Sequence, residues 1–382
     1  MDDLLKLALE EHKKYQGKLS VEVKVPMKDK RDLSLYYTPG VAEPCKVIAE
    51  DEATVYDYTG KGNTVAVISD GSAVLGLGNI GAKASIPVME GKCALLKAFS
   101  GIDAIPLCLE TQDVQEIVQI VKALEPTLGG INLEDISAPR CFEIEERLIE
   151  EMNIPIFHDD QHGTAIVCLA GLINALKVVG KKAEEVRVVV SGAGAAGIAI
   201  TKLFLKYGFG DIILQDSRGL IYEGREEGMN KYKDEIAKVT NRDALKGGLE
   251  VAMEGADVFV GVSKPGIVSK EMVRSMASDP IIFAMANPVQ EISPEDAAEA
   301  GAAVIATGGS NYPNQVNNVL VFPGIFKGVL QARGRKITDE MKLAAAEALA
   351  ELVEEPSAEK IIPDAFEPGV ADVVAEAVAK LV

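Results

Sequence analysis

Apolar and polar positions alternate along the chain in the rhythm of a parallel α/β protein. Strand-length apolar runs occur at residues 64–69, 104–109, 130–133 and 154–157, and later at residues 186–190, 211–215, 258–262, 281–285 and 303–306. Apolar residues recur every three or four positions over residues 111–124 and 143–152, which is helical periodicity. Strands that alternate with helices predict mainly parallel sheets covered by helices.

The segment between the two sets of strands predicts a domain boundary. The polar run HDDQHGT (residues 158–164) precedes residues 165–179, a predicted helix that is apolar on nearly every side and therefore buried between other elements. We predict an α/β fold with a smaller N-terminal substrate and catalytic domain over residues 1–158. A Rossmann-like dinucleotide-binding domain with a parallel sheet and C-terminal helices is predicted over residues 159–382.

Composition narrows the class of protein. The 382 residues are 48% hydrophobic and 25% charged, as in globular proteins, and the net charge of -19 argues against nucleic acid or an anionic membrane as a partner. No run of about 20 uninterrupted apolar residues suggests a membrane span, and the N-terminus lacks the features of a signal peptide. Five separated cysteines without a CxxC pair suit reduced thiols. We expect a cytoplasmic protein and, from the base rate for soluble enzymes, a homodimer.

Residues 187–200, RVVVSGAGAAGIAI, predict a dinucleotide site because they read as a strand, a GxGxxG turn and a helix whose N-terminus faces the phosphates. The predicted cofactor-binding turn consists of Gly192, Ala193, Gly194, Ala195, Ala196 and Gly197. Asp216 ends the next strand about 20 residues on, where an acid binds the ribose of NAD. Arg218 could instead bind the 2′-phosphate of NADP. The two residues leave both cofactors open, and we favour NAD.

Two pairs of carboxylates follow neighbouring predicted strands: Glu134 and Asp135, and Asp159 and Asp160. Parallel strands bring their carboxyl ends to one edge of the sheet, where four carboxylates would need a cation such as Mg²⁺ or Mn²⁺. Solvated acids and helix caps are the simpler interpretation on spacing alone. His158 and His162 have a spacing that could suggest zinc, but no third nitrogen or sulfur ligand lies at a suitable distance in the sequence.

A second glycine-rich segment, GLGNIG (residues 76–81), precedes Lys92. No acid follows at the required position, so we interpret it as a structural turn near the substrate pocket rather than a second dinucleotide site. Lys92 stands beside an apolar stretch. It is either a surface lysine whose aliphatic stem packs on apolar neighbours or, if desolvated beside a metal ion, a base with a lowered pKa.

Taken together, these segments resemble the malic enzymes over most of the chain. The segments that carry the resemblance are YTPGVAEPC (residues 37–45), GLGNIG through Lys92, NLED (132–135), FHDDQHGT (157–164), FAMANP (283–288) and NNVLVFPG (317–324). Their combination in this order is highly specific. The short length resembles the compact prokaryotic form, without an appended acetyltransferase-like domain.

The resemblance implies metal-dependent oxidative decarboxylation of L-malate to pyruvate and CO₂ with reduction of NAD or NADP. The residues that it implies are the metal ligands Glu134, Asp135 and Asp160, the proton-handling pair Lys92 and Tyr37, Asp159 beside Lys92, and the substrate ligands Asn287 and Asn318, with Asn287 also at the cofactor.

One departure from the family concerns the distal carboxylate of malate. Larger members carry an arginine just before the turn, whereas this chain has Ala73-Val74-Leu75 there, so the anchor for that carboxylate is not identified. Two other functions remain open from the residues alone. One is a metal-independent nicotinamide dehydrogenase acting on another hydroxy or amino acid, and the other is a non-catalytic dinucleotide sensor.

Overall fold

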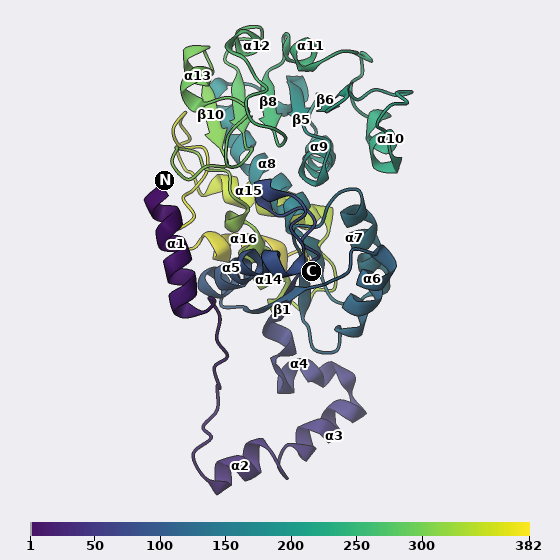
Figure 1. The fold of residues 1–382 in the computed structure, drawn as a ribbon, viewed down its shortest axis with the longest axis vertical. Helices are drawn as coiled ribbons and strands as arrows, with labels where there is room; N and C mark the ends of the chain where they lie inside the picture. Colours follow the sequence, from purple (N-terminus) through teal and green to yellow (C-terminus); the bar gives the residue numbers. More distant parts are fainter. Residues whose placement is uncertain (1) are drawn as a thin grey trace.

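The computed structural model describes residues 2–382 and contains one parallel sheet in the first half of the chain and a mainly parallel sheet in the second (Figure 1). The first sheet has the strand order β2-β1-β3-β4, with β1 Thr64–Ser69, β2 Asp103–Cys108, β3 Gly130–Leu133 and β4 Ile156–His158. All its pairings are parallel, and β1 is buried from Val65 onward, as expected for a strand covered on both faces. The predicted α/β fold is confirmed.

Helices α5 (Ala82–Ser100), α6 (Val114–Ala123) and α7 (Arg140–Glu151) accompany the first sheet. α6 buries Ile117, Val118 and Val121, the apolar face that the periodicity predicts. Its predicted start at residue 111 is wrong, because the Asp113 carboxylate accepts a hydrogen bond from the Glu116 backbone N–H at 2.9 Å and caps the helix.

The short 3₁₀ turns are η1 Glu52–Thr54, η2 Gly60–Asn63, η3 Leu75–Leu77, η4 Ala183–Glu185 and η5 Asn318–Leu320.

Helix α8 (Asp159–Val179) links the two halves of the chain and is buried almost throughout from Ala165 to Leu176. Its predicted burial is confirmed, but its predicted start at residue 165 is wrong. The helix begins directly after β4, because Asp159 and Asp160 occupy its first turn, where the helix dipole favours negative charge. By length and composition α8 could cross a membrane, but 72% of its most apolar window is buried inside the protein, as in a core helix.

The second sheet has the strand order β10-β9-β8-β5-β6-β7, in which β7 alone pairs antiparallel. Its strands are β5 Arg187–Ser191, β6 Asp211–Asp216, β7 Gly219–Leu220, β8 Val258–Gly261, β9 Ile281–Ala284 and β10 Val304–Thr307. Its helices are α9 Ala195–Tyr207, α10 Lys231–Ala237, α11 Leu249–Met253, α12 Lys270–Arg274 and α13 Pro294–Glu299. The unit β5-α9-β6 is the Rossmann-like arrangement that the glycine motif predicts.

The last helices, α14 (Phe322–Gln331), α15 (Asp339–Glu351) and α16 (Val370–Ala379), return to the middle of the molecule. α14 packs on α16 and α5, and α15 packs on α8, so the end of the chain covers both halves (Figure 1). One contiguous cluster of buried apolar side chains includes residues of both sheets and of α8. The two sheets therefore share a core, which fixes the carboxyl ends of their strands relative to each other.

The first 60 residues contain α1 (Asp2–Tyr15), α2 (Lys30–Tyr36), α3 (Ala42–Glu50) and α4 (Val55–Tyr58). None of the described side chains from residue 3 to residue 60 is buried. Figure 1 shows α2 and α3 below the rest of the molecule, joined to it by an extended segment on one side and by α4 on the other. The hydrophobic core thus begins only at β1.

Candidate active site

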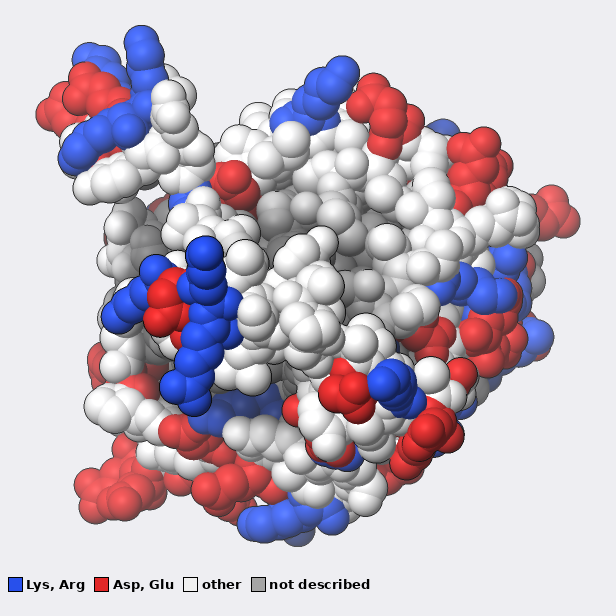
Figure 2. Space-filling view, turned by 90° about the horizontal axis from the view of Figure 1, so that it is seen from below, with Lys and Arg blue, Asp and Glu red and all other residues white. Residues whose placement is uncertain are grey.

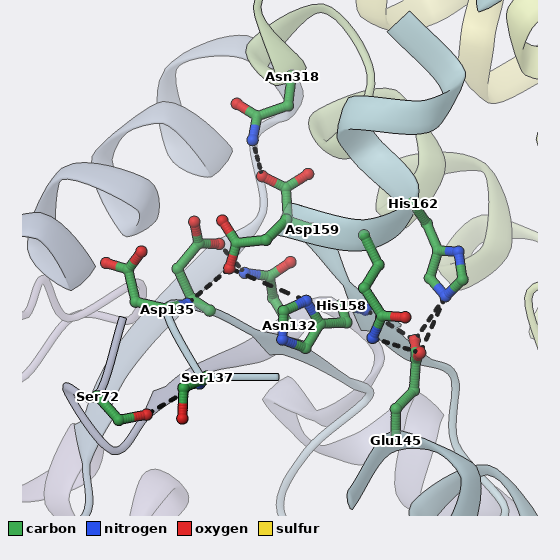
Figure 3. Close-up of polar contacts among 12 residues, drawn as sticks. Ser72, Asn132, Asp135, Ser137, Glu145, His158, Asp159, His162 and Asn318 are labelled. Carbon is green, nitrogen blue, oxygen red and sulfur yellow. Dashed lines mark hydrogen bonds and ion pairs between the residues drawn. The ribbon is translucent and has the colours of Figure 1, made fainter. Parts of the chain in front are cut away.

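Carboxylates from the end of β3 and the start of α8 form the centre of the site (Figure 3). Glu134, Asp135 and Asp160 each offer an oxygen, and these oxygens lie within 4.8 Å of one another. The Glu134 N–H donates to the Ile68 carbonyl of β1 at 2.9 Å, which continues the sheet pattern past the end of β3. The Asp135 N–H donates to Asp160 Oδ2 at 2.7 Å. We call these three residues the carboxylate cluster.

Lys92, in the middle of α5, lies against this cluster. Its Nζ is 3.0 Å from Glu134 Oε1 and donates a short hydrogen bond to Asp159. The fully buried Asp159 carboxylate also accepts a hydrogen bond from the Asn318 amide of η5 (Figure 3). The ring of Phe322 lies 4.5 Å from Lys92 Nζ on another side. Residues far apart in the sequence therefore hold one amino group in place.

The site concentrates buried negative charge. Burial alone would lower the pKa of Lys92, but the carboxylates of Asp159, Glu134 and Asp160 outweigh it, so the pKa is raised and the amine is held protonated. Burial raises the pKa of Glu134 well above its usual value, and the acidic neighbours add to this effect against the attraction of Lys92. An all-oxygen donor set with excess negative charge fits a hard divalent cation such as Mg²⁺ or Mn²⁺.

Of the two histidines of the predicted zinc alternative, His162 faces Glu145 instead of the carboxylate cluster. His162 Nε2 lies 3.0 Å from Glu145 Oε2, and the His158 backbone N–H donates to the same carboxylate at 3.0 Å (Figure 3). The His158 ring approaches Asp160 Oδ2 only to 3.9 Å. Among the described residues, the group that could hold a metal ion consists of carboxylates alone.

The glycine-rich turn lies between β5 and α9, and its glycines serve different purposes. Gly192 has φ of +117°, and a Cβ there would lie 2.6 Å from the Val262 carbonyl oxygen. A Cβ at Gly197 would lie 1.7 Å from the Gly192 carbonyl oxygen, so only glycine lets α9 pack this closely. Gly194 caps α9 and has open space where its Cβ would be. That space precedes a helix N-terminus, which is suited to a phosphate.

Asp216 ends β6, where the ribose-binding acid is predicted. Its carboxylate accepts hydrogen bonds from Arg225 at 2.5 and 2.9 Å and from Lys233 at 2.5 Å. Burial would raise the pKa of Asp216, but these hydrogen bonds lower it to about 2. The Arg218 side chain instead pairs with Glu227 at 3.1 Å, in solvent. The sequence analysis missed Arg225 and Lys233, because they lie in a loop and a short helix without a motif.

The two remaining predicted residues differ in position. Asn287 follows β9 and lies beside two other loops. Its carbonyl oxygen is 3.1 Å from where a Cβ of Gly76 would be, and its Nδ2 is 2.6 Å from where a Cβ of Gly308 would be. The GLGNIG segment therefore forms a turn against this loop. Tyr37 ends α2, with 62% of its surface exposed, and makes no contact with Lys92. The structure gathers the predicted lysine, carboxylates and Asn318, but not the tyrosine.

Three further residues shape the site and were missed. Gly163 lies one turn after Asp159, and a Cβ there would be 1.9 Å from Asp159 Oδ1. Buried Asn132 donates to Glu134 Oε2 at 2.8 Å. Glu145 lies on the buried side of α7 and accepts hydrogen bonds from both ends of the HDDQH run. Glu145 could have been found from the sequence, because it is an acid among the apolar positions of a predicted helix. The roles of Gly163 and Asn132 could not, because they depend on where the neighbouring side chains lie.

Comparisons with known proteins agree with this geometry. Residues 16–149 match the family described as malic enzyme, N-terminal domain, and residues 161–382 match malic enzyme, NAD binding domain. The bifunctional malic/malolactic enzyme of Bacillus subtilis is 62% identical over 98% of this chain and 92% of its own length. The NADP-dependent malic enzyme of Rhizobium meliloti is 52% identical over 95% of this chain and 50% of its own length.

A solved structure gives the same result. The NAD-dependent malic enzyme of Thermotoga maritima superposes with a TM-score of 0.95 at 53% identity, covering 97% of this chain and 98% of that one. The matches to the Bacillus subtilis and Thermotoga maritima proteins each cover nearly the whole chain. The chain therefore belongs to the malic enzyme family, whose reaction is the oxidative decarboxylation of malate with NAD or NADP.

Proposed function

We propose that this chain converts L-malate to pyruvate and CO₂, with a nicotinamide dinucleotide at the glycine-rich turn and Mg²⁺ or Mn²⁺ at the carboxylate cluster. One observation carries the assignment. Glu134 belongs to the cluster and also lies 3.0 Å from Lys92 Nζ. A hydroxy acid held at the cluster would therefore have an amino group beside its hydroxyl, which is the arrangement that general acid–base chemistry needs.

A nicotinamide dinucleotide bound at the glycine-rich turn would supply the hydride acceptor for C2 of malate, and a divalent ion held by Glu134, Asp135 and Asp160 would supply Lewis-acid stabilisation during loss of CO₂. Lys92 would take the proton of the C2 hydroxyl once a cation at the carboxylate cluster offsets the negative charge that otherwise holds its amine protonated, and Asp159 positions that amine. Asn287 and Asn318 orient the substrate. Tyr37 donates the proton to C3 that completes pyruvate.

We expect NAD to be preferred over NADP. Two cations beside the predicted ribose-binding acid, the buried Arg225 and the partly buried Lys233, already pair with Asp216 at 2.5 Å. A 2′-phosphate would have to displace that carboxylate, whereas a 2′-hydroxyl could donate to it. Arg218 remains for a phosphate, but it is exposed and pairs with Glu227.

We also propose that the protein is a homodimer of the cytoplasm. A homodimer is supported by the exposed apolar side chains of the first 60 residues. A cytoplasmic location is supported by the cysteines, all five of which are free and three of which are buried, as reduced thiols would be.

The test is initial-rate measurement with L-malate, comparing NAD with NADP, first after EDTA and then with Mn²⁺ or Mg²⁺, with CO₂ release followed in parallel. We expect turnover only with metal, and equal amounts of CO₂ and reduced cofactor. Turnover in EDTA would instead indicate a metal-independent dehydrogenase, and cofactor binding without turnover in any metal would indicate a sensor. Glu134→Gln should require far more metal, whereas the exposed Glu143→Gln on α7 should not.

A further inference from the structure

Glu145 is a buried acid that the proposed chemistry does not use. Most acidic side chains of a protein lie in water, and on the face of the molecule in Figure 2 they project into solvent among lysines and arginines. Glu145 is only 5% exposed and lies on the buried side of α7, beside the fully buried Ile144 and Leu148. A buried carboxylate is stable only where hydrogen bonds or opposite charges replace its water. The partners of Glu145 therefore indicate its role.

Within the described chain, all hydrogen bonds of the Glu145 carboxylate are with the HDDQH run, residues 158–162. Its Oε1 accepts a hydrogen bond from the backbone N–H of His158 at 3.0 Å. Its Oε2 accepts one from the Gln161 amide at 3.0 Å and lies 3.0 Å from His162 Nε2. One carboxylate thus holds three of the five residues of the run. We call Glu145 and these three partners the clamp.

The clamp holds one face of the first turn of α8. His158 ends β4 and is the N-cap of α8, and Gln161 and His162 follow it by three and four positions. Residues with this spacing lie on the same side of a helix. His158 makes no side-chain cap hydrogen bond, and the first N–H groups of a helix have no partner within it. Glu145 supplies an acceptor there, and its negative charge is favourable at a helix N-terminus.

The two acids between the clamp residues face the active site. Asp160 Oδ2 accepts a hydrogen bond from the Asp135 N–H at 2.7 Å and belongs to the carboxylate cluster. Asp159 accepts hydrogen bonds from Lys92 and Asn318. Figure 3 shows the carboxylate of the clamp on the other side of the run from Asp135. The run is therefore held from both sides, and the clamp and the active site share its backbone.

Rotation of this turn about the helix axis would move both of its faces together. With 3.6 residues per turn, the direction of each side chain depends on the rotation of the whole turn. A metal site needs ligand distances that are correct to within about 0.2 Å, so a small rotation is enough to misplace the Asp160 oxygen. Lys92 and Asn318 bond to Asp159 and not to Asp160. The orientation of Asp160 thus depends on the Asp135 N–H and on the clamp.

We propose that Glu145 is a positioning residue of the metal site: it fixes the rotation of the first turn of α8 and so places the Asp160 oxygen in the carboxylate cluster. The proposal rests on the proposed function for the divalent ion at that cluster. Glu145 is not itself part of the cluster and acts through Asp160. Substituting a residue that orients metal ligands typically lowers metal affinity by about 10- to 100-fold.

The affinity for Mn²⁺ alone, without malate or cofactor, tests the proposal. Free Mn²⁺ is followed by EPR spectroscopy during titration of Glu145→Ala, Glu145→Gln and the matched Glu143→Ala, whose side chain is exposed on the same helix. We expect the Kd for Mn²⁺ to rise at least about tenfold in Glu145→Ala and to stay unchanged in Glu143→Ala. Glu145→Gln keeps the side-chain volume and one acceptor oxygen, so it should fold even where Glu145→Ala does not, with a smaller rise in Kd.

Binding of NADH separates positioning from general destabilisation. The dinucleotide turn lies between β5 and α9, away from the clamp, so both Glu145 variants should bind NADH as the wild type does. An equal loss of affinity for Mn²⁺ and NADH would mean that Glu145 merely stabilises the fold, which overturns the proposal. Wild-type affinity for Mn²⁺ in both Glu145 variants overturns it as well.

The partner His162 gives a second measure. If Glu145 acts through the clamp, His162→Ala should also raise the Kd for Mn²⁺, and the double variant should bind Mn²⁺ no more weakly than Glu145→Ala alone. Additive losses would show that the two residues act independently and would contradict the clamp. A wild-type protein that binds no Mn²⁺ contradicts the metal site of the proposed function, and the proposal with it, whereas the other results leave the proposed function in place.

Discussion

Replacing two glycines of the same turn by alanine should separate folding from cofactor binding. At Gly197 the new Cβ would lie 1.7 Å from the Gly192 carbonyl oxygen, so α9 must move by more than an ångström to reach ordinary contact near 3.4 Å. Forcing atoms into a packed interior typically costs about 1–3 kcal/mol. Gly197→Ala should therefore lower the free energy of unfolding by that amount and the melting temperature by several degrees.

At Gly194 the new Cβ would meet nothing within 4 Å, and φ of -90° with ψ of -159° suits alanine. Loss of a glycine helix cap and gain from a less flexible unfolded chain are each roughly 0.5–1 kcal/mol and oppose each other. Stability should therefore hardly change. The methyl group would nevertheless occupy the space where the backbone approaches the pyrophosphate. We expect at least about tenfold weaker cofactor binding, equivalent to roughly 1.4 kcal/mol.

The assay pairs thermal unfolding without ligand with titration of reduced cofactor, followed by its fluorescence. Gly194→Ala should lose affinity at an unchanged melting temperature, whereas Gly197→Ala should lose both. Wild-type affinity in Gly194→Ala would show that the phosphates do not bind at this turn. An unchanged melting temperature in Gly197→Ala would show that α9 can shift away from the turn at little cost in stability.

Three further predictions concern charged groups. Lys92→Ala should slow malate oxidation by about 10²–10⁴-fold, and a smaller loss of its initial rate would contradict the role of Lys92. Lys97 is exposed on the same helix, so Lys97→Ala should leave the rate unchanged. Asp216→Ser frees the two cations that now pair with it, so the ratio of kcat/KM for NADP to that for NAD should rise about tenfold or more. Burial would raise the pKa of Glu145, but the His162 ring lowers it to about 2. The Glu145 carboxylate therefore stabilises the fold above pH 4.5, and this stabilisation is lost as the pH falls toward 2. In Glu145→Gln, the free energy of unfolding should fall less steeply between pH 4.5 and pH 2 than in the wild type.

The sheets and the glycine turn could be predicted from the sequence because their signals are local. A buried strand such as β1 needs only a run of apolar residues between turns, and the roles of Gly192 and Gly197 depend on the strand and helix that flank them. Convergence of Glu134 and Asp160 followed from one rule, that parallel strands end at the same edge of a sheet. Each of these inferences needed the order of elements, not their side-chain packing.

The features that could not be predicted depend on long-range contacts. The sequence shows Asp216 but not Arg225 and Lys233, which reach it from a loop and a short helix that carry no motif. The polar run after β4 resembled a loop, yet it begins α8, because Asp159 has Lys92 and Asn318 as partners and so its charge can be buried. From local composition, acidic residues are predicted to be exposed. Only their tertiary partners show that these carboxylates are buried.

The position of Tyr37 separates what folds the chain from what completes its site. Lys92, Asp159 and the carboxylate cluster lie on elements that share the common core, so their geometry is maintained by the packing of a single chain. Tyr37 lies on a segment with no buried side chain, and its backbone hydrogen bonds are to Leu33 and Val41 of the same segment. The carboxylate cluster and the dinucleotide turn are therefore positioned by folding of the single chain, whereas the proton donor of the proposed function is not.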